Sequence, residues 1–268
     1  MTRTSRMGWP MPEYMAAWKT FRRESDENDA TAKYLVSRPS WPKGRSLTIC
    51  DLGCADGQLV GKVLRRPEMK TRVVEIRLVE PDKEALETAA SHLEKNRKVK
   101  KVTRVPFRVE KVWPHEAQGS DVILAVHLAY LLTEQALRTL VMDRPPASTL
   151  FVILDAPGSV FTELWAITAK KYYGRVVRAH KFLQKISGVK GDSARNRIEA
   201  RLPRNLLFDH DYRGWLLSIL CYTNMLKASN IRKWEKQVCR VLNEHTDESE
   251  KFIECQSVCY EFPALKAP

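Results

Sequence analysis

The sequence contains no apolar stretch long enough to cross a bilayer, because its longest, Val122 to Leu132, is short and includes His127. At its beginning the sequence also lacks the apolar segment of a secretory signal peptide. We therefore expect no membrane anchor and a cytoplasmic location for this protein.

The cysteine and histidine spacing typical of a zinc site is missing too. The six cysteines lie at positions 50, 54, 221, 239, 255 and 259. They include two CxxxC pairs, but no compact Cys/His cluster accompanies either pair, and both pairs lie in or beside strand-like runs. We expect reduced, mostly buried thiols and no bound metal.

Acidic residues are scarce relative to basic ones, since 32 Asp and Glu face 45 Lys and Arg and the net charge is +13. Much of the excess lies in residues 95–108, 170–190 and 195–204. Basic stretches with interleaved aromatics can follow a nucleic-acid backbone, although no RRM or KH signature accompanies them here. Two interpretations stay open, namely a solvated basic face and a nucleic-acid track.

Hydrophobic residues make up 44% of the 268-residue sequence, which is enough for a sizeable core. The first half alternates strand-like and helix-like runs. The first strand is expected to begin at Ser46, with further strands at 76–82, 102–112, 149–155, 197–207 and 252–262. The fourth strand is expected within 121–132, where it runs into a loop. Helices are expected at 59–66, 83–96, 133–143, 159–173, 179–186, 211–227 and 231–243. This order predicts an α/β fold with a doubly wound, mostly parallel seven-stranded sheet, and the helices between the last two strands would form a cap over the strand ends.

The N-terminal region has little periodicity over residues 1–12 and then a helical pattern from Glu13. Tyr14, Trp18 and Phe21 share one face of this expected helix, which indicates either core packing or a lid beside a substrate. We divide the chain into a leader with a lid helix (1–45), a cofactor-binding core (46–156) and a C-terminal half of the sheet with helical insertions (157–268).

A glycine turn, DLGCADG at residues 51–57, follows the first strand and precedes a helix. Small residues at such a turn let the backbone approach a ligand closely. Glu80 ends the second strand, where a carboxylate can accept both hydrogen bonds of a ribose diol. The turn is neither a GxGxxG motif nor a P-loop, because no Gly-Lys-Ser/Thr follows. The alternative is an ordinary strand-to-helix turn.

Together these features resemble motif I and the acidic second-strand position of the class I S-adenosylmethionine-dependent methyltransferases. The resemblance implies a Rossmann-like fold, S-adenosylmethionine as cofactor, and Glu80 on its ribose. In that family the turn after the third strand commonly meets the adenine. The cofactor-binding residues that the resemblance implies are Asp51, Gly53, Cys54, Gly57, Glu80, Glu110, Lys111 and Val126.

Four separated segments, at residues 14–27, 127–132, 158–165 and 214–262, resemble in their order histamine N-methyltransferase and its small-amine relatives. The resemblance implies polar substrate contacts from Glu27, His127 and Gln256. Aromatic substrate contacts are expected from Tyr14, Trp18, Tyr130, Phe161 and Trp165. His127 stands where that family can carry glutamine. Each polar residue also has a structural interpretation, as a core histidine, a helix-surface acid or a solvent-facing strand residue.

The predicted activity is methyl transfer to nitrogen of a small molecule by in-line displacement, which requires alignment and exclusion of water. We expect His127 to relay the proton of the amine, because an imidazole titrates near pH 7, and Glu27 to orient the substrate. An RNA methyltransferase that uses the basic stretches is an alternative, although the fourth strand ends AVHLAY rather than Asn-Pro-Pro-Tyr/Phe. A non-catalytic interaction protein with this fold is a third hypothesis.

Overall fold

The computed structural model describes residues 20–21, 23–188, 196–208 and 228–265. The described residues divide into two compact units that interleave along the chain. Unit 1 contains those within Met1–Glu27, Asp155–Arg178 and Arg197–Val258, and unit 2 contains those within Asn28–Leu154, Ala179–Asn196 and Cys259–Pro268. The three-part division made from the sequence remains an interpretation.

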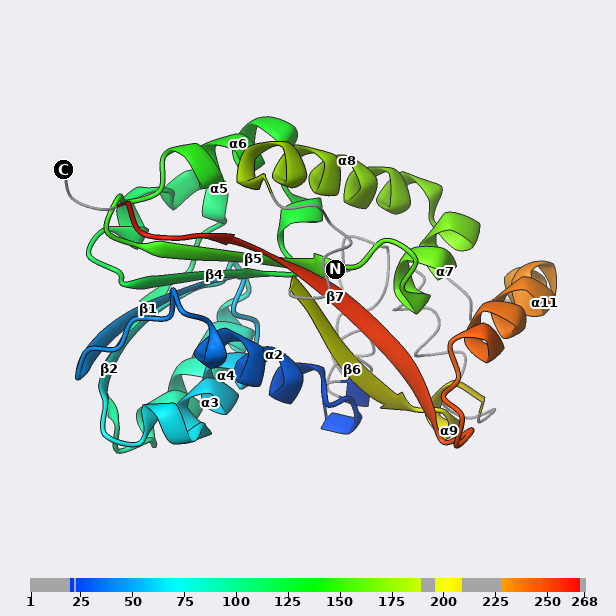
Figure 1. The fold of residues 1–268 in the computed structure, drawn as a ribbon, viewed down its shortest axis with the longest axis horizontal. Coiled ribbons are helices and arrows are strands. Elements are labelled where there is room, and N and C mark those ends of the chain that lie inside the picture. The colour runs from blue at the N-terminus through cyan, green and yellow to red at the C-terminus, as the bar shows by residue number, and fades with distance from the viewer. Residues whose placement is uncertain (1–19, 22, 189–195, 209–227, 266–268) are drawn as a thin grey trace. The chain divides into compact units, whose positions relative to one another are not determined.

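The seven strands of the described residues form one sheet in the order β3-β2-β1-β4-β5-β7-β6 (Figure 1). The strands are β1 (Ser46–Leu52), β2 (Val73–Val79), β3 (Val99–Val105), β4 (Val122–Val126), β5 (Thr149–Asp155), β6 (Arg197–Pro203) and β7 (Phe252–Phe262). Parallel pairing joins β3 to β2, β2 to β1, β1 to β4 and β4 to β5, whereas β6 and β7 are antiparallel. The expected mostly parallel, Rossmann-like sheet is therefore confirmed.

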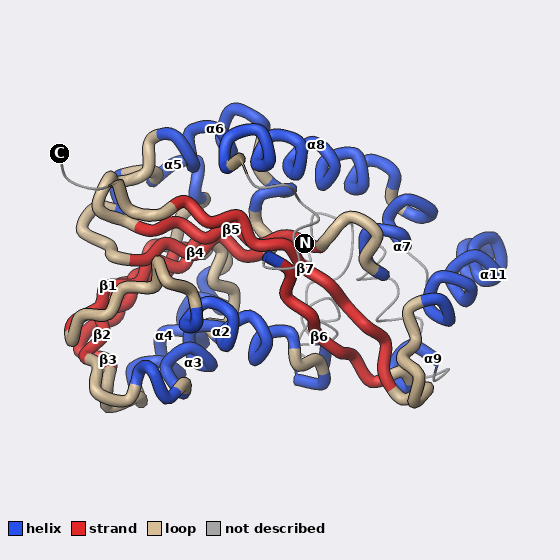
Figure 2. Tube along the Cα trace, in the orientation of Figure 1, coloured by secondary structure: helices blue, strands red, loops and turns tan. Residues whose placement is uncertain are grey.

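Helices of unit 2 lie on both sides of its strands, with α3 and α4 on one side and α5 and α6 on the other (Figure 2). The described helices are α2 (Glu27–Ser37), α3 (Gln58–Arg65), α4 (Lys83–Glu94), α5 (Val109–Val112), α6 (Glu134–Met142), α7 (Val160–Thr168), α8 (Lys170–Ser187), α9 (Asn205–Phe208) and α11 (Ala228–Glu244). No described helix is both long and apolar enough to cross a membrane.

The core of unit 2 lies along the central strands. Every residue of β5 is buried, as are four of the five residues of β4. Parallel strands that are covered by helices on both faces read as nearly continuous apolar runs, as VILAV and TLFVILD do. These runs leave the strand ends, rather than the sheet faces, as the place for a ligand.

The third strand is shorter than expected. The sequence predicts a strand over residues 102–112, but β3 ends at Val105 and the short helix α5 occupies Val109–Val112. Pro106 lacks an N–H for the ladder, and the amide of Phe107 turns back to the Val105 carbonyl at 2.9 Å. Glu110 consequently lies on an exposed helix instead of in a strand.

The fourth strand runs into a loop within residues 121–132, as the sequence predicts. It ends at Val126 because His127 adopts a left-handed backbone conformation with φ of 52°. A 3-10 helix over Ala129–Leu131 follows. The β4 end is therefore a tight turn.

Two helices, expected at 159–173 and 179–186, have different bounds in the structure. α7 ends at Thr168 because Ala169 leaves the helical region, with φ of −139° and ψ of 54°. α8 then runs unbroken from Lys170 to Ser187. The expected strand 197–207 likewise ends at Pro203, whose missing N–H cannot continue the ladder, and α9 follows.

The helix expected from Glu13 onward is interrupted, because Ser25 and Asp26 are not helical. The Ser25 hydroxyl accepts the amide of Glu27 at 3.1 Å, so α2 begins there as a separate helix. Residues 1–19 and the expected helix 211–227 lie outside the described residues, as does the greater part of the predicted cap.

Candidate functional site

The loop between β1 and α3 has a backbone that favours glycine. Gly53 and Gly57 have φ values of 72° and 73°, and Ala55 between them also has a positive φ of 48°. L-residues rarely adopt this region, since their Cβ atoms are crowded there. The amide of Gly53 donates to the Val79 carbonyl at 2.7 Å, which ties the loop to the end of β2.

Gly57 and Gly53 differ in what a Cβ atom would contact at each position. A Cβ atom on Gly57 would lie 2.9 Å from the Cβ of Ala89, so this glycine lets α3 pack closely on α4. A Cβ atom on Gly53 would meet no backbone within 4 Å, only the side chain of Leu128 from the turn after β4. The Leu128 side chain therefore lies against Gly53 on the side of the β4 turn.

Glu80 follows β2 directly and is anchored to the glycine loop. One carboxylate oxygen accepts the amide of Ala55 at 3.1 Å, and the other accepts the amide of Asp82 at 3.0 Å. Asp82 in turn caps α4 by accepting the amides of Glu84 and Ala85. A half-buried carboxylate is therefore held at the carboxyl end of the strand, beside the loop.

The other predicted cofactor contacts differ in exposure. Asp51 is 3% exposed and Cys54 is 7% exposed, so both residues are buried. Val126, the last residue of β4, is half-buried. Glu110 and Lys111 are exposed on α5, and their contact with an adenine stays a prediction. The strands that carry the loop and the β4 turn are adjacent, and the strand order reverses between them, which is where ligands of such sheets bind.

His127 occupies the turn at the end of β4. Its amide donates to the Ile153 carbonyl at 2.8 Å, and its side chain is half-buried. A histidine in the left-handed region is strained by about 1–3 kcal/mol, and such strain is concentrated at functional positions. Tyr130, in the 3-10 helix that follows, is 4% exposed, so most of its ring is interior.

In unit 1, the segment that carries Glu27 is docked on β6. The amide of Asp26 donates to the Arg201 carbonyl at 3.1 Å, and the Arg201 amide donates to the Asp26 carboxylate. Ser25 then starts α2 with Glu27 as its first residue. These hydrogen bonds hold the backbone from which the Glu27 side chain extends.

Asp155, the last residue of β5, lies beside Glu27. Carboxylate oxygens of the two residues lie within 4.8 Å of each other, and Asp155 is 4% exposed. Burial, reinforced by the charges of Glu27 and Asp155, holds the pKa of the Cys255 thiol well above its usual range. The arrangement is a strongly acidic site with a protonated thiol beside it, which suits a cation.

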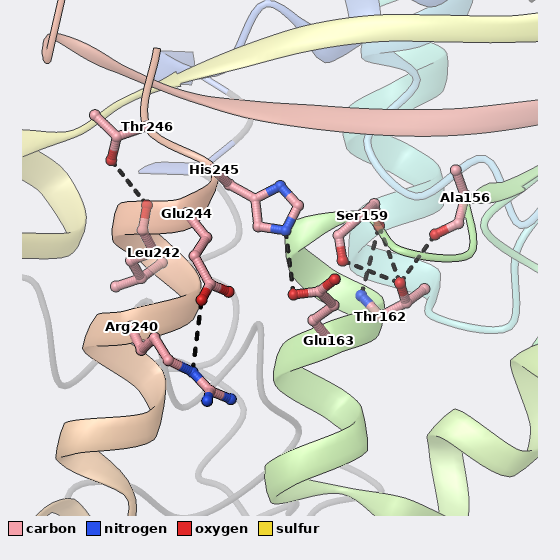
Figure 3. Close-up of polar contacts among 9 residues, drawn as sticks. All are labelled: Ala156, Ser159, Thr162, Glu163, Arg240, Leu242, Glu244, His245 and Thr246. Carbon is pink, nitrogen blue, oxygen red and sulfur yellow. Dashed lines mark hydrogen bonds and ion pairs between the residues drawn. The ribbon is translucent and has the colours of Figure 1, made fainter. Parts of the chain in front are cut away.

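Side-chain hydrogen bonds also hold the start of α7, which follows β5 after a short loop (Figure 3). Ser159 caps the helix, and the Thr162 hydroxyl donates to the Ala156 carbonyl at 2.9 Å. Phe161 and Trp165 on this helix are 4% and 3% exposed. Phe161 meets Phe21 edge to face, with ring centroids 5.7 Å apart. Their predicted role as substrate contacts stays a prediction, because their rings are almost wholly buried.

α11 is held to α7 by an ion pair. The Nε2 atom of His245 lies 3.3 Å from a carboxylate oxygen of Glu163, as Figure 3 shows. On the part of α11 nearest this contact, Arg240 and Glu244 form a second, exposed pair at 3.7 Å.

Gln256, the third predicted polar substrate contact, forms its hydrogen bond with Arg197. The Arg197 guanidinium donates to the amide oxygen of Gln256 at 3.4 Å. Successive residues of a strand point to opposite faces, so Gln256 and Cys255 face different sides of β7. The structure therefore pairs Gln256 with a cation. Tyr14 and Trp18 lie outside the described residues.

Sequence reasoning missed Asp155, although the signal was present. The run TLFVILD ends in an acid, as the second strand does with Glu80, and acids at strand ends were already the reason to select Glu80. Of the predicted thiols, Cys50, Cys54, Cys255 and Cys259 are buried and Cys239 is half-buried, all without disulfides. Cys221 lies outside the described residues.

No family model matches the chain, and no curated protein matches it in sequence. Solved structures share its fold. BH2331, a candidate methyltransferase from Bacillus halodurans, is 10% identical with a TM-score of 0.52, covering 87% of this chain and 96% of that one. At this identity the likeness shows the fold alone, which is that of the class I methyltransferases.

Two further structures are less similar. YcgJ from Bacillus subtilis is 13% identical with a TM-score of 0.47 and covers 90% of this chain and 99% of its own. The plantazolicin methyltransferase BamL, solved with a desmethylplantazolicin analog and SAH, is 11% identical with a TM-score of 0.47 over 94% and 90% of the two chains. These scores carry no argument about function.

Proposed function

We propose that the protein is an S-adenosylmethionine-dependent methyltransferase and that unit 2 holds the cofactor. The observation that carries the proposal is the anchored carboxylate of Glu80, which accepts an amide of the glycine loop at its own strand end. A carboxylate in this position can accept both hydrogen bonds of a ribose diol. The class I methyltransferase fold supports the same assignment.

The residues of unit 2 fit such a cofactor. The backbone of Gly53 would pass beside its methionine part, since no side chain of its own blocks the approach. Glu80 would hold the ribose, and Glu110 and Lys111 are the proposed adenine contacts. When bound, the cofactor supplies an electrophilic methyl group on a sulfonium. The protein contributes alignment of the acceptor and exclusion of water.

The acceptor that we propose is a small nitrogenous molecule that arrives as an ammonium and is held by unit 1. Two carboxylates within 4.8 Å repel one another, and a cation beside them offsets that repulsion. A charge as buried as that of Asp155 is costly unless it is paired, so an ammonium would add to the partners that this carboxylate already has within the protein. Glu27 and Asp155 would orient the ammonium, while its reacting nitrogen must lose a proton to become a nucleophile.

His127 is the proposed proton relay. The test is the pH dependence of kcat/KM in His127→Asn, because asparagine tolerates the left-handed conformation but has no titrating ring. We expect wild-type activity to rise with pH through the neutral range and the variant to lose that rise along with much of its activity. An unchanged profile in the variant would exclude the relay.

The activity itself can be tested with methyl-labelled S-adenosylmethionine and a panel of primary, secondary and tertiary amines. Alcohols of the same shape are the matched controls, because they lack the cationic nitrogen. We expect label in the amines and none in the alcohols. If label appeared in RNA from a fractionated cell extract and not in small molecules, the acceptor would be RNA rather than an amine.

A further inference from the structure

α8 is basic along its whole length. Its 18 residues, KKYYGRVVRAHKFLQKIS, contain six lysines and arginines and no aspartate or glutamate. An exposed helix usually mixes both signs, since pairs of opposite charge three or four residues apart stabilise it and like pairs destabilise it. The unbalanced charge of α8 therefore lowers the stability of the helix, so helix stability does not explain why α8 carries six cations.

The cations of α8 lie on its exposed side. Val176, Ala179, His180 and Leu183 are buried and form the opposite, inner side of the helix. Positions 171, 178 and 185 repeat every seven residues, close to two helical turns, so they share one face. We define the α8 basic face as the five exposed cations Lys170, Lys171, Arg178, Lys181 and Lys185.

None of these five cations forms an ion pair with any residue in the described parts of the chain. The basic run at β3 is different. There Lys100 lies 3.6 Å from Glu75, and Arg104 contacts the carboxylates of Glu87 and Glu94. The charge at β3 is thus partly neutralised within the protein, whereas the charge of the α8 basic face is available to a partner.

Aromatic side chains accompany the cations. Tyr173 is 40% exposed and is one of few large apolar side chains exposed among the described residues. Its neighbour Tyr172 lies under the guanidinium of Arg175, with the carbon 5.5 Å from the ring centroid. Tyr173 lies one helical turn from Lys170, at i+3, so its exposed phenol offers a base a stacking surface at the edge of the α8 basic face.

We propose that the α8 basic face binds single-stranded nucleic acid through its phosphates, with Tyr173 stacking on a base. A membrane surface fits less well, because a membrane-bound helix inserts its apolar side and the apolar side of α8 is buried in the protein. The net charge of +13 favours a polyanion over a small acidic ligand. This inference stands whether or not the protein transfers methyl groups.

The geometry predicts the salt dependence. Lys171 and Lys185 are separated by about 21 Å along the helix axis, at 1.5 Å per residue. If five cations each neutralise one phosphate of a single strand, the logarithm of the binding constant should fall with a slope of about −3.5 against the logarithm of the salt concentration. Affinity should then fall about 100-fold between 50 and 200 mM salt.

The test is fluorescence anisotropy of a labelled 20-nucleotide RNA of mixed sequence with the full chain. The variant K170Q/K171Q/K181Q/K185Q keeps good helix formers, and its salt slope should fall to about −0.7. The matched control K33Q/K43Q/K70Q/K236Q has the same net charge, from exposed lysines elsewhere, and should keep the wild-type slope. Tyr173→Ala should weaken binding about fivefold or more without changing the slope.

Three results would overturn the proposal. The first is the absence of RNA binding by the wild-type protein at 50 mM salt. The second is an unchanged slope in the α8 variant whose circular dichroism matches that of the control. The third is equal displacement of the RNA by polyglutamate at the same charge concentration, since the face would then bind any anion and Tyr173 would contribute nothing.

Discussion

The glycine loop of unit 2 and the carboxylate pair of unit 1 are built in different ways. The loop and Glu80 come from two consecutive strands, and backbone amides fix their geometry. Glu27 and Asp155 come from distant parts of the sequence and meet through the packing of β5 and of the segment that pairs with Arg201. The first arrangement is local and has a motif, whereas the second depends on tertiary structure.

This difference predicts how each region responds to mutation. Changes in the glycine loop should damage cofactor binding and stability together, because the same backbone serves both. Changes in the carboxylate pair should alter acceptor binding and leave the cofactor unaffected. A mutation that breaks this separation would show that the two regions are not independent.

The largest effect is expected for Gly57→Ala. Gly119 has the same φ of 73°, but a Cβ atom there meets nothing within 4 Å, whereas at Gly57 it would lie 2.9 Å from Ala89. Gly119→Ala should cost about 1–2 kcal/mol of stability from backbone strain alone, and Gly57→Ala about 2 kcal/mol more from overpacking. Urea unfolding measures the difference. Equal losses in the two variants would contradict the close packing of α3 on α4.

Glu80→Gln should weaken binding of S-adenosylhomocysteine about 10- to 100-fold, since hydrogen bonds to a charged group contribute about 1.5–3 kcal/mol. Glu84→Gln is the matched control, because Glu84 is exposed one turn away and should bind like the wild type. Calorimetric titration gives both constants. If the two variants bound alike, Glu80 would have no special role in the cofactor site.

Asp155→Asn should raise the KM of an amine acceptor about tenfold while the affinity for the cofactor stays constant, because a charged partner of the ammonium is replaced by a neutral amide of the same shape. Glu254→Gln removes an exposed carboxylate of β7 and should change neither constant. A cofactor affinity that falls with Asp155→Asn would contradict the separation of the two regions.

The smallest effect is expected at the thiols, which flank both regions and should react with neither substrate nor reagent. Burial raises the pKa of Cys50 to about 12 and holds that of Cys255 well above its usual range. Because a raised pKa keeps a thiol protonated, alkylation of both should stay slow from pH 7 to 9, while the half-buried Cys239 serves as the internal comparison. Rapid labelling of Cys255 would contradict its burial beside Glu27.

The sequence predicted the sheet well because its strands are long apolar runs, and β5 and β7 have the expected bounds. It failed where a local backbone feature overrides the pattern, at Pro106 and at Ala169. The glycine loop and Glu80 were identified because they form a contiguous motif. The proximity of Glu27 to Asp155 and the Arg197–Gln256 contact were not predicted, since only long-range packing brings such side chains together.

The most direct test of the central claim is a calorimetric titration of the wild-type protein with S-adenosylhomocysteine, repeated with Glu80→Ala after circular dichroism has shown that the variant is folded. We predict one binding site per chain in the wild type and at least a tenfold loss of affinity in the variant. No heat of binding in the wild type, or equal affinity in the folded variant, would contradict a cofactor site at the glycine loop.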